Sequence, residues 1–380
     1  MDADVGIIGV GTMGSMAAWQ LSKRGVSVLG FEQFGIGNDR TAAGGESRLF
    51  RTAYMEGAEY VPLLIEAKKL WRELEKESGR SLLTLNGGLM IGEKDSPPIK
   101  AILESIDNYK LEHEILDIKQ ASKKYPQFKY FANDLVILDK EAGFIRPELS
   151  VVSATYLAIN KGAKIKQYTT VQKIIPDSNG VTIIANGESY RVRKVVITTG
   201  AWTVNLLPEL KDKLMPRRLL LTWFIPKNID DTKPEKLPVF ARMRGDFRLT
   251  GTPTLDGTMV KASFTKEPLP VDNPKELYRD VYSEEILKLR DSVETLLPAV
   301  YPDPVRSNAY MDAYTSDNHA VLGTIPGLKE VVIASGFSGH GFKLAPVIGK
   351  IISEIIIDGK TTKNIKNLAP ERFVDSFHLI

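Results

Sequence analysis

The sequence predicts an α/β protein of two domains, and two patterns along the chain support this fold class. The first thirty residues follow the order strand, glycine-rich turn, helix, strand and acid, which is the order of a βαβ unit in a parallel sheet. Between residues 217 and 264, several runs of β-type residues are separated by glycine and proline, as in a largely antiparallel sheet. A chain of 380 residues is also longer than one simple core requires.

A glycine motif follows the first strand, which is expected over residues 4–8. The motif contains three glycines separated by larger residues, in the order Gly9-Val10-Gly11-Thr12-Met13-Gly14. Gly9 permits a tight turn, Gly11 lets the backbone approach a pyrophosphate, and Gly14 lets the next helix pack closely on the strand. The spacing therefore predicts a Rossmann-like dinucleotide site.

The elements after the motif complete that site. A helix is expected over residues 15–24, and its free N–H groups and positive dipole end would face the phosphates. A second apolar strand over 26–31 ends on Glu32, whose carboxylate would accept hydrogen bonds from ribose hydroxyls. The glycine motif alone does not separate NAD from FAD, so the choice between these cofactors stays open at this point.

The remaining elements follow from hydrophobic spacing and from the positions of glycine and proline. Helices are expected at 60–78, 99–108, 147–161, 284–297 and from 341 to about 358. Strands are expected at 82–91, 163–168, 171–175, 181–185, 190–198, 217–225, within 239–264, and at 321–323 and 331–335. Residues 33–46 and 143–147 are expected to be loops. The basic stretch 119–129 is expected to be a solvated helix and loop, not a binding patch.

The composition excludes several classes of function. Fifty basic residues balance 47 acids to a net charge of +3, so neither nucleic acid nor a membrane surface is implied as a partner. The chain has no cysteine, which excludes disulfides, thiolate metal sites, cysteine nucleophiles and any cofactor attached through cysteine sulfur. The four histidines show no metal-ligand spacing, so no metal is expected. No basic leader and no membrane-spanning apolar stretch is seen, so a cytoplasmic protein is expected.

Four stretches together carry a family resemblance. They are the glycine motif with Glu32, the run Ser47-Arg48-Leu49-Phe50-Arg51 followed by Tyr60-Val61-Pro62-Leu63, the turn Gly200-Ala201-Trp202, and the run Gly336-Phe337-Ser338-Gly339-His340-Gly341-Phe342-Lys343. On these motifs the chain resembles, nearly end to end, the monomeric sarcosine oxidase and N-methyltryptophan oxidase family. This family consists of FAD-dependent amine oxidases of the D-amino acid oxidase superfamily. The last of the four runs is the strongest single signal.

The resemblance implies a fold and a reaction. A Rossmann-like FAD-binding domain would be interleaved with a substrate domain built on a mixed, largely antiparallel sheet. The FAD-binding domain would comprise residues 1–85, 145–215 and 315–380, and the substrate domain 86–144 and 216–314. The expected reaction moves a hydride from the carbon next to an amine nitrogen to flavin N5, and oxygen then reoxidises the flavin to give hydrogen peroxide. The expected substrate is a secondary, N-alkylated amino acid, and the enzyme is expected to be a monomer.

The resemblance assigns FAD contacts to every matching stretch. The strand near Val171 would receive the adenine through its backbone, and the helix from Gly341 would direct its positive end at the reduced flavin. The full set of expected cofactor residues is Gly9, Gly11, Thr12, Met13, Gly14, Glu32, Arg48, Val171, Gly200, Trp202, Gly339, His340, Gly341, Phe342 and Lys343. For His340 the alternative is a histidine that simply fills a turn.

Cationic side chains are the expected catalytic and substrate-binding groups. Arg51 and Lys343 match family positions that hold the substrate carboxylate, which needs cationic partners because its unpaired burial is unfavourable. Lys261 would lie over the flavin ring, where a positive charge stabilises oxygen as it takes its first electron, and Arg48 would lie against the flavin on the same side. The alternatives are surface ion pairs for Arg51 and Lys343, and a strand with Lys261 facing water.

The chain departs from the family where the cofactor is attached. Family members usually hold the flavin through a cysteine, and alignment on residues 317–319 places that position near Tyr310. FAD is therefore expected to be dissociable. A histidine and tyrosines of the family's substrate pocket are also missing, and Thr265 and Leu249-Thr250 stand near their places. The amino acid oxidised is left open.

Three other functions remain open on the sequence. An FAD-dependent dehydrogenase of the same architecture would pass electrons to a quinone or a carrier protein, although Lys261 argues for oxygen. An NAD-dependent dehydrogenase would share the glycine motif but would have no use for the run at 336–343. A non-catalytic flavoprotein or a tRNA-modifying relative is the third, and the absence of a basic stripe disfavours nucleic acid.

Overall fold

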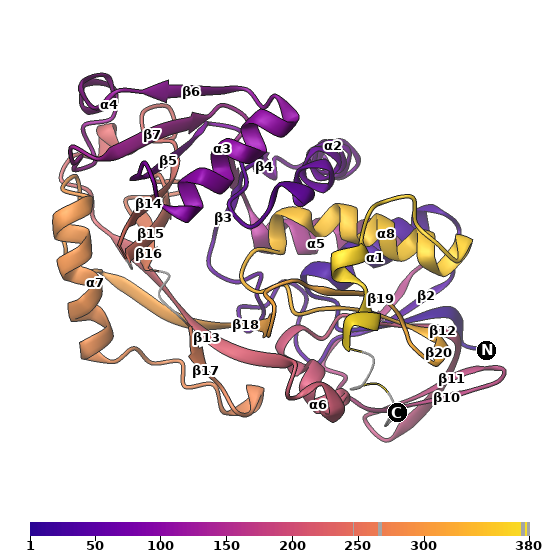
Figure 1. Cartoon of the computed structure of the whole chain (residues 1–380). Helices are drawn as coiled ribbons and strands as arrows, with labels where there is room; N and C mark the ends of the chain where they lie inside the picture. The colour runs from indigo at the N-terminus through magenta and orange to yellow at the C-terminus, as the bar shows by residue number, and fades with distance from the viewer. Residues whose placement is uncertain (246, 265–267, 374–376, 378–380) are drawn as a thin grey trace.

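The chain forms two large sheets and one small sheet, and it passes between them several times (Figure 1). The computed structural model describes residues 1–245, 247–264, 268–373 and 377. Because each sheet takes strands from distant parts of the chain, sites where the sheets meet combine residues far apart in sequence.

The first large sheet contains the expected βαβ unit. Within the described residues it has eight strands in the order β10-β11-β12-β1-β2-β9, with β20 beside β12 and β19 beside β20. Strands β9, β2, β1, β12 and β20 run parallel, and β10, β11 and β19 are antiparallel to their neighbours. The strands are β1 Ala3–Ile8, β2 Val28–Phe31, β9 Lys164–Lys166, β10 Val171–Asp177, β11 Gly180–Ala185, β12 Glu188–Ile197, β19 Val321–Ile325 and β20 Leu328–Ser335. All eight lie at or beside expected strands, which confirms the α/β prediction.

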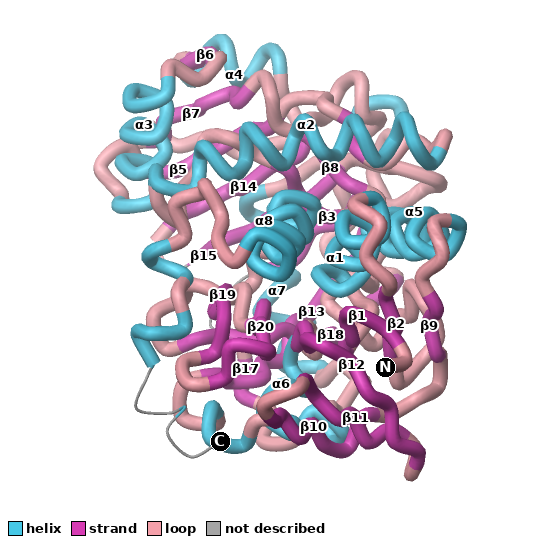
Figure 2. The backbone as a smooth tube through the Cα atoms, turned by 90° about the vertical axis from the view of Figure 1, so that its right-hand side faces the viewer, coloured by secondary structure: helices cyan, strands magenta, loops and turns pink. Residues whose placement is uncertain are grey.

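Helices cover one face of this sheet. Helices α1 Thr12–Lys23, α5 Pro147–Asn160 and α8 Ala345–Asp358 lie side by side, and α2 Val61–Ser78 packs on α8 and α5 (Figure 2). Gly349 lets α8 approach α1, because a Cβ there would come within 2.5 Å of the Met16 backbone. This close packing ties the helix of the glycine motif to the last long helix of the chain.

The second large sheet is mixed and largely antiparallel, as expected. Its order is β17-β13-β16-β15-β14-β5-β7-β6, with β18 beside β13, and β14 and β5 are its parallel pair among the described strands. Helix α7 Ser283–Leu296 packs on it through Leu289, Val293 and Leu296. The strands are β5 Gly88–Glu93, β6 His113–Leu116, β7 Asp134–Asp139, β13 Leu214–Phe224, β14 Val239–Arg244, β15 Phe247–Thr252, β16 Val260–Phe264, β17 Leu269–Pro270 and β18 Arg306–Thr315, and α3 Pro97–Tyr109 and α4 Ile118–Lys124 flank β5 to β7.

A small sheet corrects two expectations. It pairs β3 Arg48–Phe50 with β8 Gly143–Ile145 and β8 with β4 Leu83–Thr84. The loop expected over 143–147 is therefore wrong for its first three residues, because its pairing partner lies far away in sequence. The single strand expected over 82–91 is two strands in different sheets, β4 and β5, separated by a bend at Gly87.

The parallel strands deliver three motifs to one edge. Ile8 of β1 is in register with Ile197 of β12, which is in register with Ile333 of β20. Since ligands of such sheets bind beyond the carboxyl ends of the strands, the segments that follow these three positions are placed together. They are the glycine motif, the turn at Gly200 and the run from Gly336.

The last helix begins later than expected. A 3₁₀ turn covers Phe342–Leu344, and α8 begins at Ala345 with Pro346 in its first turn, where the missing N–H is tolerated. None of the helices in the described part of the chain is long and apolar enough to cross a membrane.

Candidate active site

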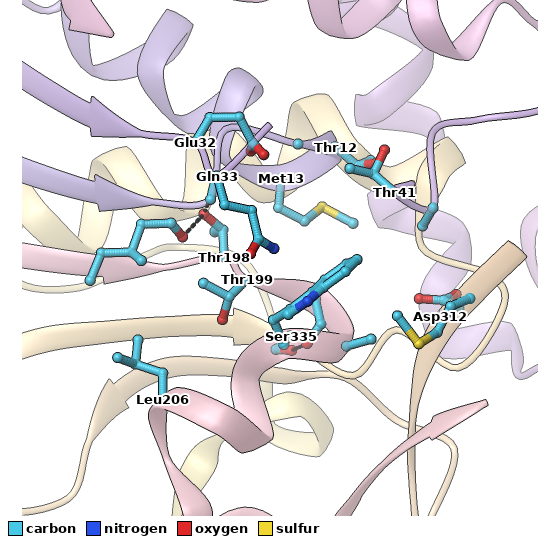
Figure 3. A pocket seen from close by; sticks show the side chains of 18 of the residues that line it. Thr12, Met13, Glu32, Gln33, Thr41, Thr198, Thr199, Leu206, Asp312 and Ser335 are labelled. Atoms are coloured by element: carbon cyan, nitrogen blue, oxygen red, sulfur yellow. Dashed lines mark hydrogen bonds between the residues drawn. The ribbon is translucent and has the colours of Figure 1, made fainter. Parts of the chain in front are cut away.

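A cavity of about 400 Å³ lies at the carboxyl ends of β1, β2, β12 and β20. In Figure 3, Glu32 and Asp312 lie on opposite sides of this first cavity, with Met13 between them. Most of the expected cofactor residues line it: Gly9, Gly11, Thr12, Met13, Glu32, Arg48, Val171, Gly200, Trp202, Gly339, Gly341 and Phe342. The structure thus brings the glycine motif and the run at 336–343 to one cavity. Gly14, His340 and Lys343 lie outside its lining.

The three motif glycines differ in what surrounds them. A Cβ at Gly14 would lie 1.9 Å from the Gly9 carbonyl oxygen, and one at Gly9 would lie 2.7 Å from the Thr198 carbonyl oxygen. A Cβ at Gly11 would meet only Thr41 Cγ2, at 3.9 Å. Gly9 and Gly14 are therefore needed by the fold itself, whereas the space beside Gly11 opens into the cavity.

Glu32 is buried at the end of β2 and is held by the backbone. Its Oε2 accepts a hydrogen bond from the Val10 N–H and its Oε1 accepts one from the Phe34 N–H, each at 3.0 Å. Burial raises the pKa of Glu32 above its ordinary value, and these two N–H groups oppose the shift. Each carboxylate oxygen keeps a lone pair, so Glu32 can still accept a hydroxyl from the cavity.

The turn after β12 closes another side of the first cavity. Thr198 Oγ1 donates to the Gly9 carbonyl at 2.7 Å, which ties the glycine motif to this turn. Gly200 adopts a φ of 52° and opens a 3₁₀ turn through Trp202. The Trp202 ring meets Phe34 edge-on at 5.8 Å between centroids. Val171, at the start of β10, completes this part of the lining.

A second cavity of about 970 Å³ adjoins the first. The two share six lining residues, which are Ala42, Arg48, Met311, Asp312, Gly339 and Phe342. All the expected catalytic and substrate-binding residues line the second cavity, together with His340: Arg48, Arg51, Lys261 and Lys343. The structure therefore rules out a water-facing Lys261, and it places Arg51 and Lys343 inside the protein, not on its surface.

Arg48 and Lys261 are held by backbone carbonyls of the same loop. Arg48 donates to the carbonyls of residues 42, 44 and 47, and Lys261 Nζ donates to those of Gly45 and Ser47, both at 2.8 Å. Burial lowers the pKa of both side chains, that of Lys261 strongly, and Arg48 lowers the Lys261 value further. In its ammonium form Lys261 has three N–H donors, so that form keeps one N–H for the cavity.

Arg51 carries a donor without a protein partner. Its Nη2 forms an ion pair with Glu56, while its Nη1 is buried and has no hydrogen-bond acceptor among the described residues. The guanidinium carbon also lies 5.2 Å from the centre of the Tyr54 ring. A buried donor without a partner is unfavourable, so this geometry suits an anionic ligand in the second cavity.

Lys343 and His340 form one hydrogen-bonded group with Tyr54. Lys343 Nζ donates to the His340 carbonyl at 2.9 Å and to Tyr54 Oη at 3.4 Å. Burial lowers the pKa of Lys343 to about 7, and the charge of Arg51 acts in the same direction. Burial also lowers the pKa of His340 to about 4, so its imidazole is neutral. His340 Nε2 lies 3.1 Å from the Asn318 carbonyl oxygen, which can only accept, so the ring proton is assigned to Nε2. His340 Nδ1 then accepts a hydrogen bond from Tyr54 Oη at 2.8 Å.

Sequence reasoning missed three polar residues in the second cavity or directly behind its lining. Glu56 pairs with Arg51, Tyr54 joins His340 to Lys343, and Asp312 lies at the junction with the first cavity. None of the three belongs to a local motif. The one available signal was the short distance along the chain from Arg51 to Tyr54 and Glu56.

Some of the residues that stand near the places of missing family residues line the second cavity, and others do not. Thr250 and Tyr310 line the second cavity, whereas Leu249 is fully buried in the core of the second sheet. Thr265 lies outside the described residues. Among those that are described, no group of three or more histidine, aspartate or glutamate side chains could hold a metal ion.

A family model and curated relatives match this chain over nearly its whole length. The family described as FAD dependent oxidoreductase matches residues 4–355. Monomeric sarcosine oxidase of Streptomyces avermitilis is 33% identical over 374 residues, which is 97% of each chain. Monomeric sarcosine oxidase of Bacillus sp. (strain B-0618) is 31% identical and covers 95% of this chain and 94% of its own. N-methyl-L-tryptophan oxidase of Salmonella enteritidis is 27% identical and covers 95% and 96%.

Solved structures show the same fold at lower identity. NikD, an unusual amino acid oxidase essential for nikkomycin biosynthesis, superposes with a TM-score of 0.87 at 24% identity and covers 97% of both chains. L-proline dehydrogenase from P. horikoshii gives a TM-score of 0.84 at 22% identity and covers 98% of this chain and 97% of that chain.

Proposed function

The chain belongs to the family of FAD dependent oxidoreductases, and from that premise we propose that it is an oxidase of a secondary, N-alkylated amino acid that forms hydrogen peroxide. One observation carries the substrate class. The cavity next to the cofactor cavity is lined by buried cations, and one of them, Arg51, has a donor nitrogen with no acceptor among the described residues. An amino acid carboxylate supplies the acceptor. The curated relatives are named for oxidation of sarcosine and N-methyl-L-tryptophan, which supports an N-alkyl substrate.

The residues of the first cavity fit FAD. Only a glycine at position 11 leaves the space through which a pyrophosphate can reach the start of α1, and Glu32 faces the cavity with free lone pairs. Since the chain has no cysteine, FAD is held without a thioether bond. Gly341 and Phe342 lie in the first turn before α8, whose leading N–H groups have no carbonyl partner within the helix and suit a negatively charged ring edge.

The division of labour among the side chains follows from their positions. FAD, when bound, would supply the acceptor for the hydride, and with it the two electrons, that leaves the carbon next to the substrate nitrogen. Arg51 and Lys343 bind the carboxylate from two directions and so orient that carbon. Neutral His340 holds Tyr54 and, through its carbonyl, Lys343. Because these groups are buried, they also keep water from the reacting carbon.

Lys261 and Arg48 have a separate role in the proposal. Arg48 on β3 lines both cavities, and Lys261 on β16 lines the second; both are held by backbone carbonyls of residues 42–47. In its ammonium form Lys261 has one N–H left for the second cavity. A positive charge there stabilises the negative charge that oxygen gains with its first electron. This role favours an oxidase over a dehydrogenase that passes electrons to a quinone or a carrier protein.

Two further assignments belong to the proposal. We propose that residues 1–85, 145–215 and 315–380 form the FAD-binding domain and that 86–144 and 216–314 form the substrate domain, since all strands of the first sheet fall in the former set. A monomer is proposed because curated relatives carry that word in their names. Light scattering of the purified protein would test the monomer.

The colour of the purified protein and peroxide release test the function. The protein should be yellow, and acid or heat should release free FAD quantitatively. Oxygen-dependent peroxide formation is then measured across N-methyl amino acids, cyclic imino acids and glycated amino acids. Rapid dye reduction without peroxide would favour the dehydrogenase, and no flavin reduction by any member of the panel would overturn the proposed substrate class.

A further inference from the structure

Asp312 occupies the junction between the two cavities. It lies on β18, is half-buried and lines both the first and the second cavity. Figure 3 shows its carboxylate at the side of the first cavity opposite Glu32. A substrate whose carboxylate is bound by Arg51 and Lys343, and whose reacting carbon faces the cofactor, must place its nitrogen near this junction.

The carboxylate of Asp312 is oriented by hydrogen bonds and has no ion-pair partner within the part of the chain that the structure describes. Its Oδ1 accepts from the Ala313 N–H at 2.8 Å and its Oδ2 accepts from the Gly339 N–H at 3.0 Å. Each oxygen therefore keeps a lone pair for the cavity. The other described acids of the second cavity are held ionised by cations. Glu56 pairs with Arg51 through Oε1, its buried Oε2 has no hydrogen-bond partner among the described residues, and Arg51 and Lys343 lower its pKa. Asp317 pairs with Arg372, which lowers the pKa of Asp317.

The surroundings bring the pKa of Asp312 and the pKa of a bound ammonium group closer to each other. Burial raises the pKa of Asp312, an effect that the two N–H groups and Arg48 only partly offset. The cations that line the second cavity with it lower the pKa of a bound ammonium group by like-charge repulsion. Arg48 from β3 is the charged side chain that acts on the Asp312 carboxylate, and Asp312 in turn raises the pKa of Tyr314 on β18. The register partner of Asp312 on β13 is Arg217. The other charged and titratable groups that line the second cavity with Asp312 include Arg51, Glu56, Lys261, Tyr310, His340 and Lys343.

We propose that Asp312 is a catalytic residue that accepts the proton of the substrate's secondary ammonium group before hydride transfer. This inference rests on the proposed function, since it requires an amine substrate. In the step, one N–H bond breaks, an O–H bond forms on Asp312, and the electron pair stays on nitrogen. That lone pair is then available to stabilise the positive charge left when the hydride departs from the neighbouring carbon. The proton stays within the site, so no further reactant is needed.

Other groups in the cavity are less suited to this step. His340 Nδ1 already accepts from Tyr54, and burial raises the pKa of Tyr314 well above its ordinary value, so Tyr314 stays protonated. Lys343 is the closest competitor, because burial lowers its pKa to about 7. A bound carboxylate would raise that value again and return Lys343 to its charged form, which cannot accept a proton.

The pH dependence of flavin reduction tests the proposal. Anaerobic reduction is followed at saturating substrate for wild type and Asp312→Asn, with the panel member that wild type oxidises fastest. Wild type should reduce its flavin at a rate that is flat from pH 7 to 9. In Asp312→Asn only the free base already present reacts. For an amine with a pKa of about 10, this fraction is about 1 in 1,000 at pH 7, so the rate should fall roughly 1,000-fold there and recover as the pH approaches 10. Asp312→Glu should restore most of the flat profile.

Binding of two unreactive acids gives a readout independent of turnover. Glycine betaine carries a fixed positive charge and no nitrogen lone pair, and methoxyacetate is a neutral ether. By calorimetry, Asp312→Asn should lower the affinity for glycine betaine about tenfold relative to that for methoxyacetate, because only the former loses a counter-charge. Asp303→Asn, an exposed surface substitution, controls for the loss of an acid.

The outcomes separate this inference from the function on which it depends. If wild type reduces its flavin but Asp312→Asn has the same pH profile and the same ratio of affinities, Asp312 is not the acceptor. A wild-type rate that rises tenfold per pH unit from 7 to 9 would also overturn the proposal, and this measurement needs no variant to fold. If wild type oxidises no secondary amino acid at all, the proposed function fails first.

Discussion

The two cavities meet at Arg48 and Asp312, yet they are built in different ways. The first is shaped chiefly by backbone: glycines, a 3₁₀ turn and strand ends surround it, and Glu32 is fixed by main-chain N–H groups. The second is shaped by charged side chains that come from four separate segments. The difference follows from their tasks. A cofactor common to a family needs a fixed cradle, whereas an amino acid needs charges placed at particular atoms.

Gly14→Ala should have the largest effect, because it changes the backbone of the glycine motif that shapes the first cavity. The added Cβ would lie 1.9 Å from the Gly9 carbonyl oxygen and 2.7 Å from Thr198 Oγ1, so strand and helix would have to separate. We expect a loss of at least about 3 kcal/mol of folding stability and no bound flavin. Thermal unfolding and the ratio of flavin to protein measure the two effects.

Two matched substitutions sharpen this result. Gly257→Ala, where no atom lies within 4 Å of the new Cβ, should leave stability and flavin content unchanged. Gly11→Ala should keep the stability of the apoprotein while weakening FAD binding roughly tenfold to 100-fold, since its Cβ points into open cavity. A wild-type flavin content in Gly14→Ala would show that FAD binding does not need the close packing of the glycine motif.

Lys261→Met tests the charge that lies beside Arg48 in the second cavity. We expect reoxidation of the reduced enzyme by oxygen to slow about 100-fold or more, with much less change in flavin reduction by substrate, because the charge acts on oxygen and not on the amino acid. Stopped-flow absorbance of each half-reaction measures this. Lys329→Met, on the exposed surface, is the control. Equal losses in both half-reactions would reject the assignment.

Arg51→Ala should affect the second cavity alone. Loss of its charge-assisted hydrogen bonds should raise the substrate KM roughly tenfold to 100-fold, while the flavin content stays at the wild-type level. Arg290→Ala removes a half-buried arginine that lines neither cavity and serves as the control. If flavin were lost instead, Arg51 would act in cofactor binding or folding, and the distinction between the two cavities would fail.

The same contrast explains what the sequence could predict. The glycine motif and Glu32 carry their chemistry within about thirty residues, so local spacing was enough to place them at a nucleotide cavity. Lys261, Arg51 and Lys343 came only from the resemblance to a family, because no local pattern joins them. The structure brings them to one cavity, and their roles remain proposals.

The strands that the sequence did not predict form only by pairing with strands that lie far away along the chain. β8 was expected to be a loop because its three residues become a strand only by pairing with β3 and β4. β18 was not expected, although it lies along β13 over ten register pairs. Asp312 belongs to that strand, so its place between the cavities could not be seen without the pairing.

The smallest expected effect is a change of ligand affinity with pH in the second cavity. Burial and Arg51 lower the pKa of Lys343 to about 7, so the free enzyme loses this charge as the pH rises through 7. A carboxylate favours the charged form, and methoxyacetate should therefore bind about fivefold to tenfold more weakly at pH 8 than at pH 6.5. His340, with a pKa of about 4, and Tyr54, with a pKa far above its usual range, keep their protonation states across this window. Lys343→Arg should bind with a flat profile because the guanidinium stays charged, and an unchanged slope in that variant would assign the titration to another group.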